Sequence, residues 1–244
     1  MGQVTSAWQF VADVILLHHT VYLVDVLMMY AFLIAIAAGG LWLLVHGRTW
    51  YLLVGSFALW LAYQFEPAWA DGIPWPIQHN TMFHIAPWQF TFVVALCIGY
   101  HHLAFTNWLN RIAVLAFGGA ALIFGVLVYL ELTHAQQPLL AQLSAKPSEG
   151  PVRILACLFV FQLVRYLVTY FWRPLYAGLG WLLLPLGQNS LYAYTMHIVI
   201  IAAVWRLAVP HQGSEAFNLA LQLSTILVVW ALVKKKILFN VIPR

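Results

Sequence analysis

Charged side chains are scarce in this chain of 244 residues, because Asp, Glu, Lys and Arg together make up only 7% of it. Soluble globular domains carry about 25% charged residues. Hydrophobic residues make up 64% of the chain, and so few charges cannot cover a water-facing surface. The composition therefore excludes an ordinary soluble domain. It predicts an integral membrane protein with the lipid bilayer as its first partner.

Cysteine is also rare, and the signatures of several soluble function classes are missing. The two cysteines, Cys97 and Cys157, lie inside apolar runs, which is typical of free thiols packed as small hydrophobes. His79 and His84 are five positions apart with no cysteine beside them, so no metal site is expected. The net charge is only +4, and no nucleic-acid-binding motif is present. A nucleic-acid partner is therefore not expected.

Long apolar runs are abundant, and a spanning helix needs about 20 such residues. Seven runs come close to that length: 22–45, 50–65, 87–105, 111–131, 152–172, 188–208 and 216–233. The predicted fold class is all-α, a polytopic transmembrane helix bundle with about seven spanning helices. We interpret 1–244 as a single integral membrane domain with an interfacial segment (1–20), a helix bundle (21–234) and a cytoplasmic tail (235–244). The short apolar piece 177–186 is expected to extend the fifth helix or to lie at the interface.

Positive charges are divided unevenly between alternate loops. If the helices alternate in direction, seven fall on one side: Arg48, Arg111, Arg173, Lys234, Lys235, Lys236 and Arg244. Three fall on the other side: Lys146, Arg153 and Arg206. Because basic loops favour the cytoplasm, the bias predicts a cytoplasmic C-terminus and an outside N-terminus. The outside loops are then 66–86, 133–151 and 209–215.

Polar side chains inside apolar runs are costly, so they face protein or a wet cavity. Asp25 either caps its helix or lines an outward-facing polar cavity. Arg165 either extends its charge to the interface or meets a phosphate from the cytosol. The tryptophans of loop 66–86 fit a sugar-binding surface, with rings for stacking beside amide and acidic groups. They fit an interfacial aromatic belt equally well.

The stretch "LLLPLGQNSLYAYTMHIVI" (182–200) combines an apolar background with several polar side chains. Asn189 or Ser190 can cap the first turn of a helix. His197 lies too far along that helix to serve as a cap, and it either bonds a tyrosine or carbonyl or takes part in proton transfer. Tyr194 and Ser190 share its face by helical spacing. We therefore expect His197 to point into the bundle toward a polar partner.

"PLGQNSLYAYTMHIVI" (185–200) resembles the late-helix signature Gly-x-x-Ser-x-x-x-Tyr/Phe-x-x-His of membrane acyltransferases. Three earlier stretches are similar, in the same order, to the OpgC type of the acyltransferase-3 superfamily, which succinylates osmoregulated periplasmic glucans. These stretches are "YLVDVLMMY" (22–30), "GRTWYLLVGSFALWLA" (47–62) and "IAPWQFTFVVALCIGY" (85–100). The resemblance covers roughly residues 20 to 208, and Met28 stands where the family has proline.

The resemblance implies acyl transfer from acyl-CoA, as co-substrate, to a sugar hydroxyl on the outer side of a bacterial inner membrane. No bound cofactor is implied. His197 is the catalytic candidate, as the general base that removes the hydroxyl proton. The CoA phosphates would approach past Arg165 and Arg173. The implied substrate-binding residues are Asp25, Trp88, Gln89, Asn189, Ser190 and Tyr194.

Members of this type are longer, and helices that precede the matched region carry the basic residue and histidine usually assigned to catalysis. We therefore expect a chain that lacks this region and has little or no turnover alone, its catalytic part being lost or encoded as a separate chain. The alternative function is a non-catalytic accessory or structural subunit of a larger membrane protein complex. A haem protein is a third reading, but it needs two histidines at similar depth, and only His197 is expected deep in the membrane.

Overall fold

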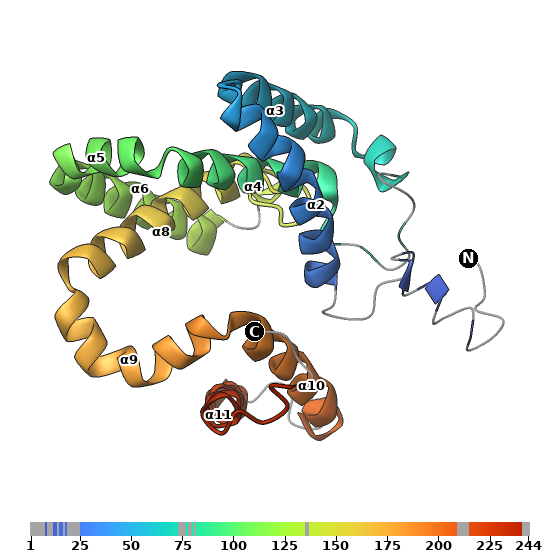
Figure 1. Ribbon diagram of the computed structural model, residues 1–244, viewed down its shortest axis with the longest axis vertical. Helices are drawn as coiled ribbons and strands as arrows, with labels where there is room; N and C mark the ends of the chain where they lie inside the picture. Colours follow the sequence, from blue (N-terminus) through green and yellow to red (C-terminus); the bar gives the residue numbers. More distant parts are fainter. Residues whose placement is uncertain are drawn as a thin grey trace. The chain divides into compact units, whose positions relative to one another are not determined.

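The computed structural model confirms the predicted all-α fold class (Figure 1). Its described residues are 25–72, 82–134, 137–208 and 215–240, with isolated positions at 8, 12–13, 15–16, 18, 77 and 80. Within these ranges every regular element is a helix. The predicted interfacial segment 1–20 lies largely outside the described residues, as do tail positions 241–244.

The helices of the described residues correspond closely to the apolar runs. They are α2 (Asp25–Val45), α3 (Thr49–Phe65), the 3₁₀ helix η1 (Pro67–Gly72), α4 (Ile85–Tyr100), α5 (His102–Arg111), α6 (Ala113–His134), α7 (Pro138–Leu143), α8 (Pro151–Tyr170), α9 (Trp172–Gln188), α10 (Ser190–Ala208) and α11 (Glu215–Lys234). Each of the seven predicted runs overlaps one of the helices α2, α3, α4, α6, α8, α10 and α11, so composition alone located these helices.

The number of helices able to cross a bilayer is smaller than the predicted seven. α2, α6, α8 and α11 are long and apolar enough, and α4 and α5 pass only as a pair bent by 86°. α3 has 17 residues, and the apolar part of α10 is the shorter segment Ser190–Val204. The described residues therefore form a helical bundle with four candidate spans, or five if the bent pair counts as one.

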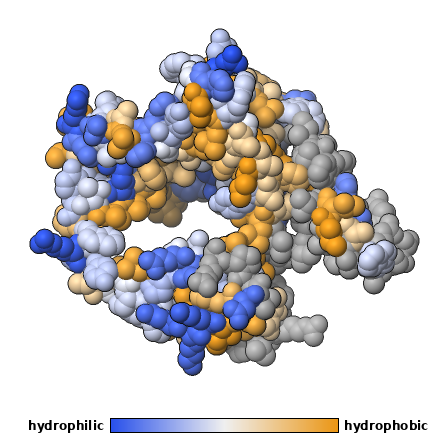
Figure 2. Space-filling view, viewed as in Figure 1, coloured by the Kyte–Doolittle hydropathy of each residue, from blue (hydrophilic) through white to orange (hydrophobic). Residues whose placement is uncertain are grey.

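Large apolar side chains are exposed along these helices, as contact with lipid requires. On α6, Leu115 is 78% exposed and Leu122 is 69% exposed. Orange hydrophobic atoms accordingly cover much of the visible surface in Figure 2. This surface supports a protein embedded in a bilayer.

The chain divides into two compact units, residues 1–166 and 167–244. In unit 1, α2, α3 and α4 pack around Leu44, Val93 and Cys97. A Cβ on Gly40 would lie 3.0 Å from a methyl group of Leu96, so glycine allows α2 to approach α4 closely. This division into units does not test the prediction that 1–244 is a single integral membrane domain, which therefore stays a prediction.

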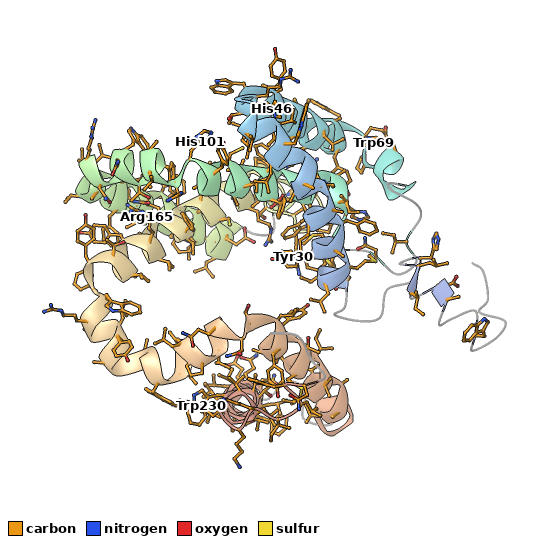
Figure 3. All side chains as sticks on the ribbon, in the orientation of Figure 1. Tyr30, His46, Trp69, His101, Arg165 and Trp230 are labelled. Atoms are coloured by element: carbon orange, nitrogen blue, oxygen red, sulfur yellow. The ribbon has the colours of Figure 1, made fainter. Side chains whose placement is uncertain are left out.

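One end of unit 1, called the histidine end, consists of residues 46–49 and 101–102. The Thr49 hydroxyl and His101 Nε2 are hydrogen bonded at 3.1 Å, so the start of α3 is tied to the end of α4. At His101 the backbone leaves the α-helical path, and α5 departs at 86°. The predicted run 87–105 is therefore broken after Tyr100. Figure 3 shows His46 and His101 at this end.

Unit 2 is built from α9, α10 and α11. Tyr192 is fully buried, and its hydroxyl donates a 2.5 Å hydrogen bond to the carbonyl of Ile237. The Tyr192 ring meets Phe239 edge to face. Trp230 Nε1 donates to the Trp181 carbonyl at 2.8 Å, which joins α11 to α9. The start of the predicted tail, 235–240, is thus folded against α10.

The apolar piece 177–186 does not extend α8 directly. It is the larger part of α9, a helix of 17 residues that begins after a break at Phe171. Its location at the membrane interface stays a prediction. Pro185 lies inside α9, where it removes a backbone donor and crowds the preceding turn, and the helix ends at Gln188.

Candidate functional site

The opposite end of unit 1, called the loop end, joins the end of α3, the start of α4, residues 82–84 and the hairpin 144–150. Gln64 Nε2 donates to the Ser148 carbonyl at 2.7 Å. Lys146 Nζ lies 4.6 Å from the centre of the Phe83 ring. These contacts place parts of the predicted outside loops 66–86 and 133–151 together. They agree with the prediction that both loops lie on one side; which side faces the cytoplasm stays a prediction.

Gln89, a predicted substrate-binding residue, is a fully engaged link between α3 and α4. It is 5% exposed, and its Oε1 accepts a 2.6 Å hydrogen bond from the Ser56 hydroxyl. Its Nε2 donates to the carbonyls of Ser56 and Ala86. A buried amide with these partners avoids the desolvation penalty of an unbonded polar group. Gln89 therefore holds the two helices together at the loop end.

Trp88 also belongs to this end of unit 1. Its Nε1 donates to the Met82 carbonyl at 3.3 Å, and its ring lies beside Phe83. Asp25 is the first residue of α2, and its Oδ1 accepts a 3.0 Å hydrogen bond from the neighbouring Val26 amide. A common substrate site for Asp25, Trp88 and Gln89 stays a prediction.

Aromatic rings and a buried turn complete the loop end. Trp60 stacks on Phe57, with ring centres 5.5 Å apart, and both rings contact Phe90. Trp60 is 7% exposed, and its Nε1 donates to the backbone carbonyl of Glu149 at 3.0 Å. The indole therefore connects the aromatic cluster of α3 and α4 to hairpin 144–150.

Glu149 is the residue that sequence reasoning missed. It is 3% exposed, and its Oε2 atom has no hydrogen-bond partner among the described residues. The nearby Thr91 hydroxyl is likewise buried without a hydrogen bond. Burial raises the pKa of the Glu149 carboxyl to about 7, against smaller lowering effects of Thr91 and Arg153. A carboxyl with this pKa exchanges its proton near neutral pH.

The hairpin geometry explains how an acidic loop residue becomes buried. Glu149 has a positive φ of 46°, and Gly150 follows it. A Cβ on Gly150 would lie 2.1 Å from the Leu143 carbonyl oxygen, so only glycine fits this close approach. Arg153 donates from Nε and Nη2 to the Ser144 carbonyl. A single acid followed by glycine before an apolar helix was the only sequence signal.

Arg165 lies near the end of α8, away from the loop end (Figure 3). Its Nε donates to Gln162 Oε1 at 3.0 Å, and its Nη1 donates to Asn110 Oδ1 at 3.2 Å. These bonds fasten α5 to α8. Both acceptors are neutral amide oxygens, so they position the guanidinium without neutralising its positive charge.

The remaining predicted site residues lie in unit 2. Asn189 forms the junction of α9 and α10, but its Nδ2 donates back to the Pro185 carbonyl at 2.9 Å. Its side chain therefore stabilises the end of α9 rather than capping α10. Ser190 is the first residue of α10 and is exposed, Tyr194 is half-buried, and Arg173 is exposed in the first turn of α9.

His197 does not point into the helices of its own unit. It is exposed, and no hydrogen bond joins it to another described residue. The expectation that His197 points into the bundle toward a polar partner stays a prediction. The buried side of α10 carries Tyr192 and Met196, which pack against Val229 and Val233 of α11. His197 faces away because apolar packing occupies the inner side.

Metal ligands do not gather in the described part of the chain, where no group of three His, Cys, Asp or Glu side chains is placed to hold an ion.

The chain matches a known protein family. The family model described as OpgC protein matches residues 1–238. The chain belongs to the OpgC protein family. No curated protein and no solved structure matches it.

Proposed function

We propose that the protein acts in acyl transfer, from an acyl-CoA to a sugar hydroxyl of a periplasmic glucan. The family match over residues 1–238 carries this proposal. In the reaction, the sugar oxygen attacks the thioester carbonyl and forms an ester. The carbon–sulfur bond breaks, and the hydroxyl proton leaves through a base while CoA departs as its thiol.

The acceptor is assigned to the loop end of unit 1. Trp88 is half-buried beside Phe83 there, and such rings pack against the apolar faces of sugars. Asp25 offers a carboxylate at the start of α2. Gln89 acts indirectly in this proposal, since its amide is engaged by Ser56 and holds the surrounding helices.

The donor is assigned to the end where α5 meets α8. Arg165 is held there by two amide oxygens. A guanidinium positioned in this way suits a phosphate of CoA, because its planar donors match the phosphate oxygens. In unit 2, Arg173 is an exposed cation. His197 remains the candidate general base, since its exposed ring has no hydrogen bond to another described residue.

Deletion of the gene in its host tests the proposal directly. Periplasmic glucans from the deletion strain should lose an acid-bearing acyl substituent, measured by anion-exchange chromatography and by the acid released in mild alkali. Restoring the gene should return the substituent. Glucans that are unchanged by deletion would contradict the proposed function.

A second experiment separates a catalyst from an accessory subunit. The purified protein is incubated with radiolabelled succinyl-CoA and unsubstituted glucan. Transfer that falls at least tenfold in His197→Ala would support a catalytic histidine, by the usual size of general base effects. If deletion removes the substituent but the purified protein transfers nothing and carries a stoichiometric partner, the accessory function holds.

A further inference from the structure

The hairpin 144–150 is docked on unit 1 through its backbone. Trp60 donates to the Glu149 carbonyl at 3.0 Å, and Gln64 donates to the Ser148 carbonyl at 2.7 Å. Both donors belong to α3. Each of these two neutral hydrogen bonds contributes about 1 kcal/mol to docking. They hold the hairpin on α3 without an ion pair to that helix.

The Glu149 side chain lies underneath this docked backbone. It is 3% exposed, with Oε2 buried and without a hydrogen bond, and the Thr91 hydroxyl of α4 is unbonded as well. An ionised carboxylate needs hydrogen-bond donors or a nearby cation when it is buried. With Oε2 unbonded, burial therefore favours the protonated carboxyl.

Burial favours the neutral form of the carboxyl more strongly than the surrounding groups favour its ionised form. α8 contributes Arg153 and Cys157, which interact with it electrostatically. Arg153 is exposed, and its donors are engaged by the Ser144 carbonyl. Lys146 of the hairpin is placed over Phe83. α3 and α4 present Trp60, Gln64 and Thr91, which are neutral. No buried cation among the described residues offsets a charge on Glu149.

We propose that Glu149 is the proton-sensitive latch of the loop end: its neutral form holds hairpin 144–150 against α3 and α4, and its ionisation releases the hairpin. The ionised side chain then gains hydration only by leaving its buried position. Release uncovers Trp60, whose indole is hydrogen bonded to the docked hairpin. The latch is independent of the proposed acyl transfer.

The sign of the effect follows from linkage. The pKa of Glu149 is raised above its ordinary value of 4.5 to about 7. Docking is therefore favoured at low pH and weakens as the pH rises. Between the ordinary pKa of 4.5 and about 7, the ratio of open to docked hairpin rises by up to about tenfold per pH unit, because opening is then coupled to the loss of one proton. Above about pH 7 the carboxyl is ionised in both forms, and the ratio levels off.

Hydrogen–deuterium exchange of the full chain in lipid nanodiscs tests the latch between pH 5.5 and 8.5. Rates for a peptide covering 144–150 are corrected for intrinsic exchange and compared with a peptide from α2. In the wild type, protection of the hairpin should fall by up to about tenfold per pH unit from pH 5.5 to about 7 and then level off, while α2 stays constant. Wild-type hairpin protection that does not change with pH would overturn the proposal.

Three variants make the test specific. Glu149→Gln mimics the neutral carboxyl and should make hairpin protection independent of pH. Thr91→Val removes a group that lowers the pKa of Glu149 in the docked form, so the loss of protection should continue to higher pH before it levels off. Glu215→Gln, which changes an acid in the first turn of α11, should behave as wild type. A pH response retained in Glu149→Gln, or one unaltered by Thr91→Val, would overturn the latch.

Discussion

The two ends of unit 1 use polar side chains in different ways. At the loop end, Ser56, Gln89 and Glu149 are all less than a tenth exposed and connect separate segments. At the histidine end, the bond between Thr49 and His101 is exposed. Buried polar contacts carry the larger penalty when one partner is lost. The comparison shows that hydrogen bonds of similar length can differ in how much their loss destabilises the protein.

The most damaging change should be Gly150→Ala. A Cβ there would lie 2.1 Å from the Leu143 carbonyl oxygen, and backbone atoms cannot move aside as a flexible side chain can. We expect the hairpin to be displaced and stability to fall by more than about 3 kcal/mol, at the upper end of single-substitution effects. Thermal unfolding in detergent measures this, with Gly55→Ala as a control because nothing lies within 4 Å of its added Cβ. Equal melting temperatures for the two variants would contradict the close approach.

The next largest effect should come from Gln89→Leu. The change leaves the buried Ser56 hydroxyl without its Gln89 partner and should cost about 1–3 kcal/mol. The double variant Ser56→Ala/Gln89→Leu should be more stable than the sum of the single changes, because no orphaned hydroxyl remains. A double-mutant cycle measures this coupling, and strictly additive losses would argue against it.

Trp60→Phe should have a smaller effect. It retains an aromatic ring beside Phe57 and Phe90 but removes the donor to the Glu149 carbonyl. We expect a loss of about 1 kcal/mol, together with faster hydrogen exchange in 144–150. Exchange unchanged in that segment would show that the indole does not hold the hairpin.

The smallest effect should appear at the histidine end. Thr49→Val removes the exposed hydrogen bond to His101, and exposed changes of this kind stay within about 0.5 kcal/mol. The melting temperature should therefore move little. A loss as large as that of Gln89→Leu would remove the contrast between the two ends.

Much of the fold could be predicted from hydropathy, because lipid selects long apolar helices regardless of sequence detail. The positions of seven helices and the pairing of loops 66–86 and 133–151 on one side followed from that pattern and from charge. The start of α10 at Ser190 also agrees with the predicted run 188–208. The bend at His101 did not follow, because the predicted run 87–105 continued across it. This bend depends on local backbone geometry and on contacts such as Thr49 with His101.

The candidate site was predictable only in part. Trp88 and Gln89 both lie at the loop end, yet the Gln89 amide is hydrogen bonded to Ser56. The burial of Glu149 arises from a turn that Gly150 permits, and the sequence pattern alone did not indicate it. His197 was expected to point into the bundle, whereas the buried face of α10 within unit 2 carries Tyr192 and Met196. Helical spacing shows which residues share a side, whereas packing decides which side is buried.

The bond between Tyr192 and Ile237 has a consequence for biosynthesis. The two residues are 45 positions apart, and the chain is made from its N-terminus. α10 is therefore synthesised well before the carbonyl that accepts from its buried tyrosine exists. Until α11 and the following turn emerge, the Tyr192 hydroxyl must form its hydrogen bond with water, with lipid headgroups or with the insertion machinery. Unit 2 can become a finished folding unit only when synthesis has passed Ile237, so premature termination before that point would yield a chain recognisable to membrane quality control.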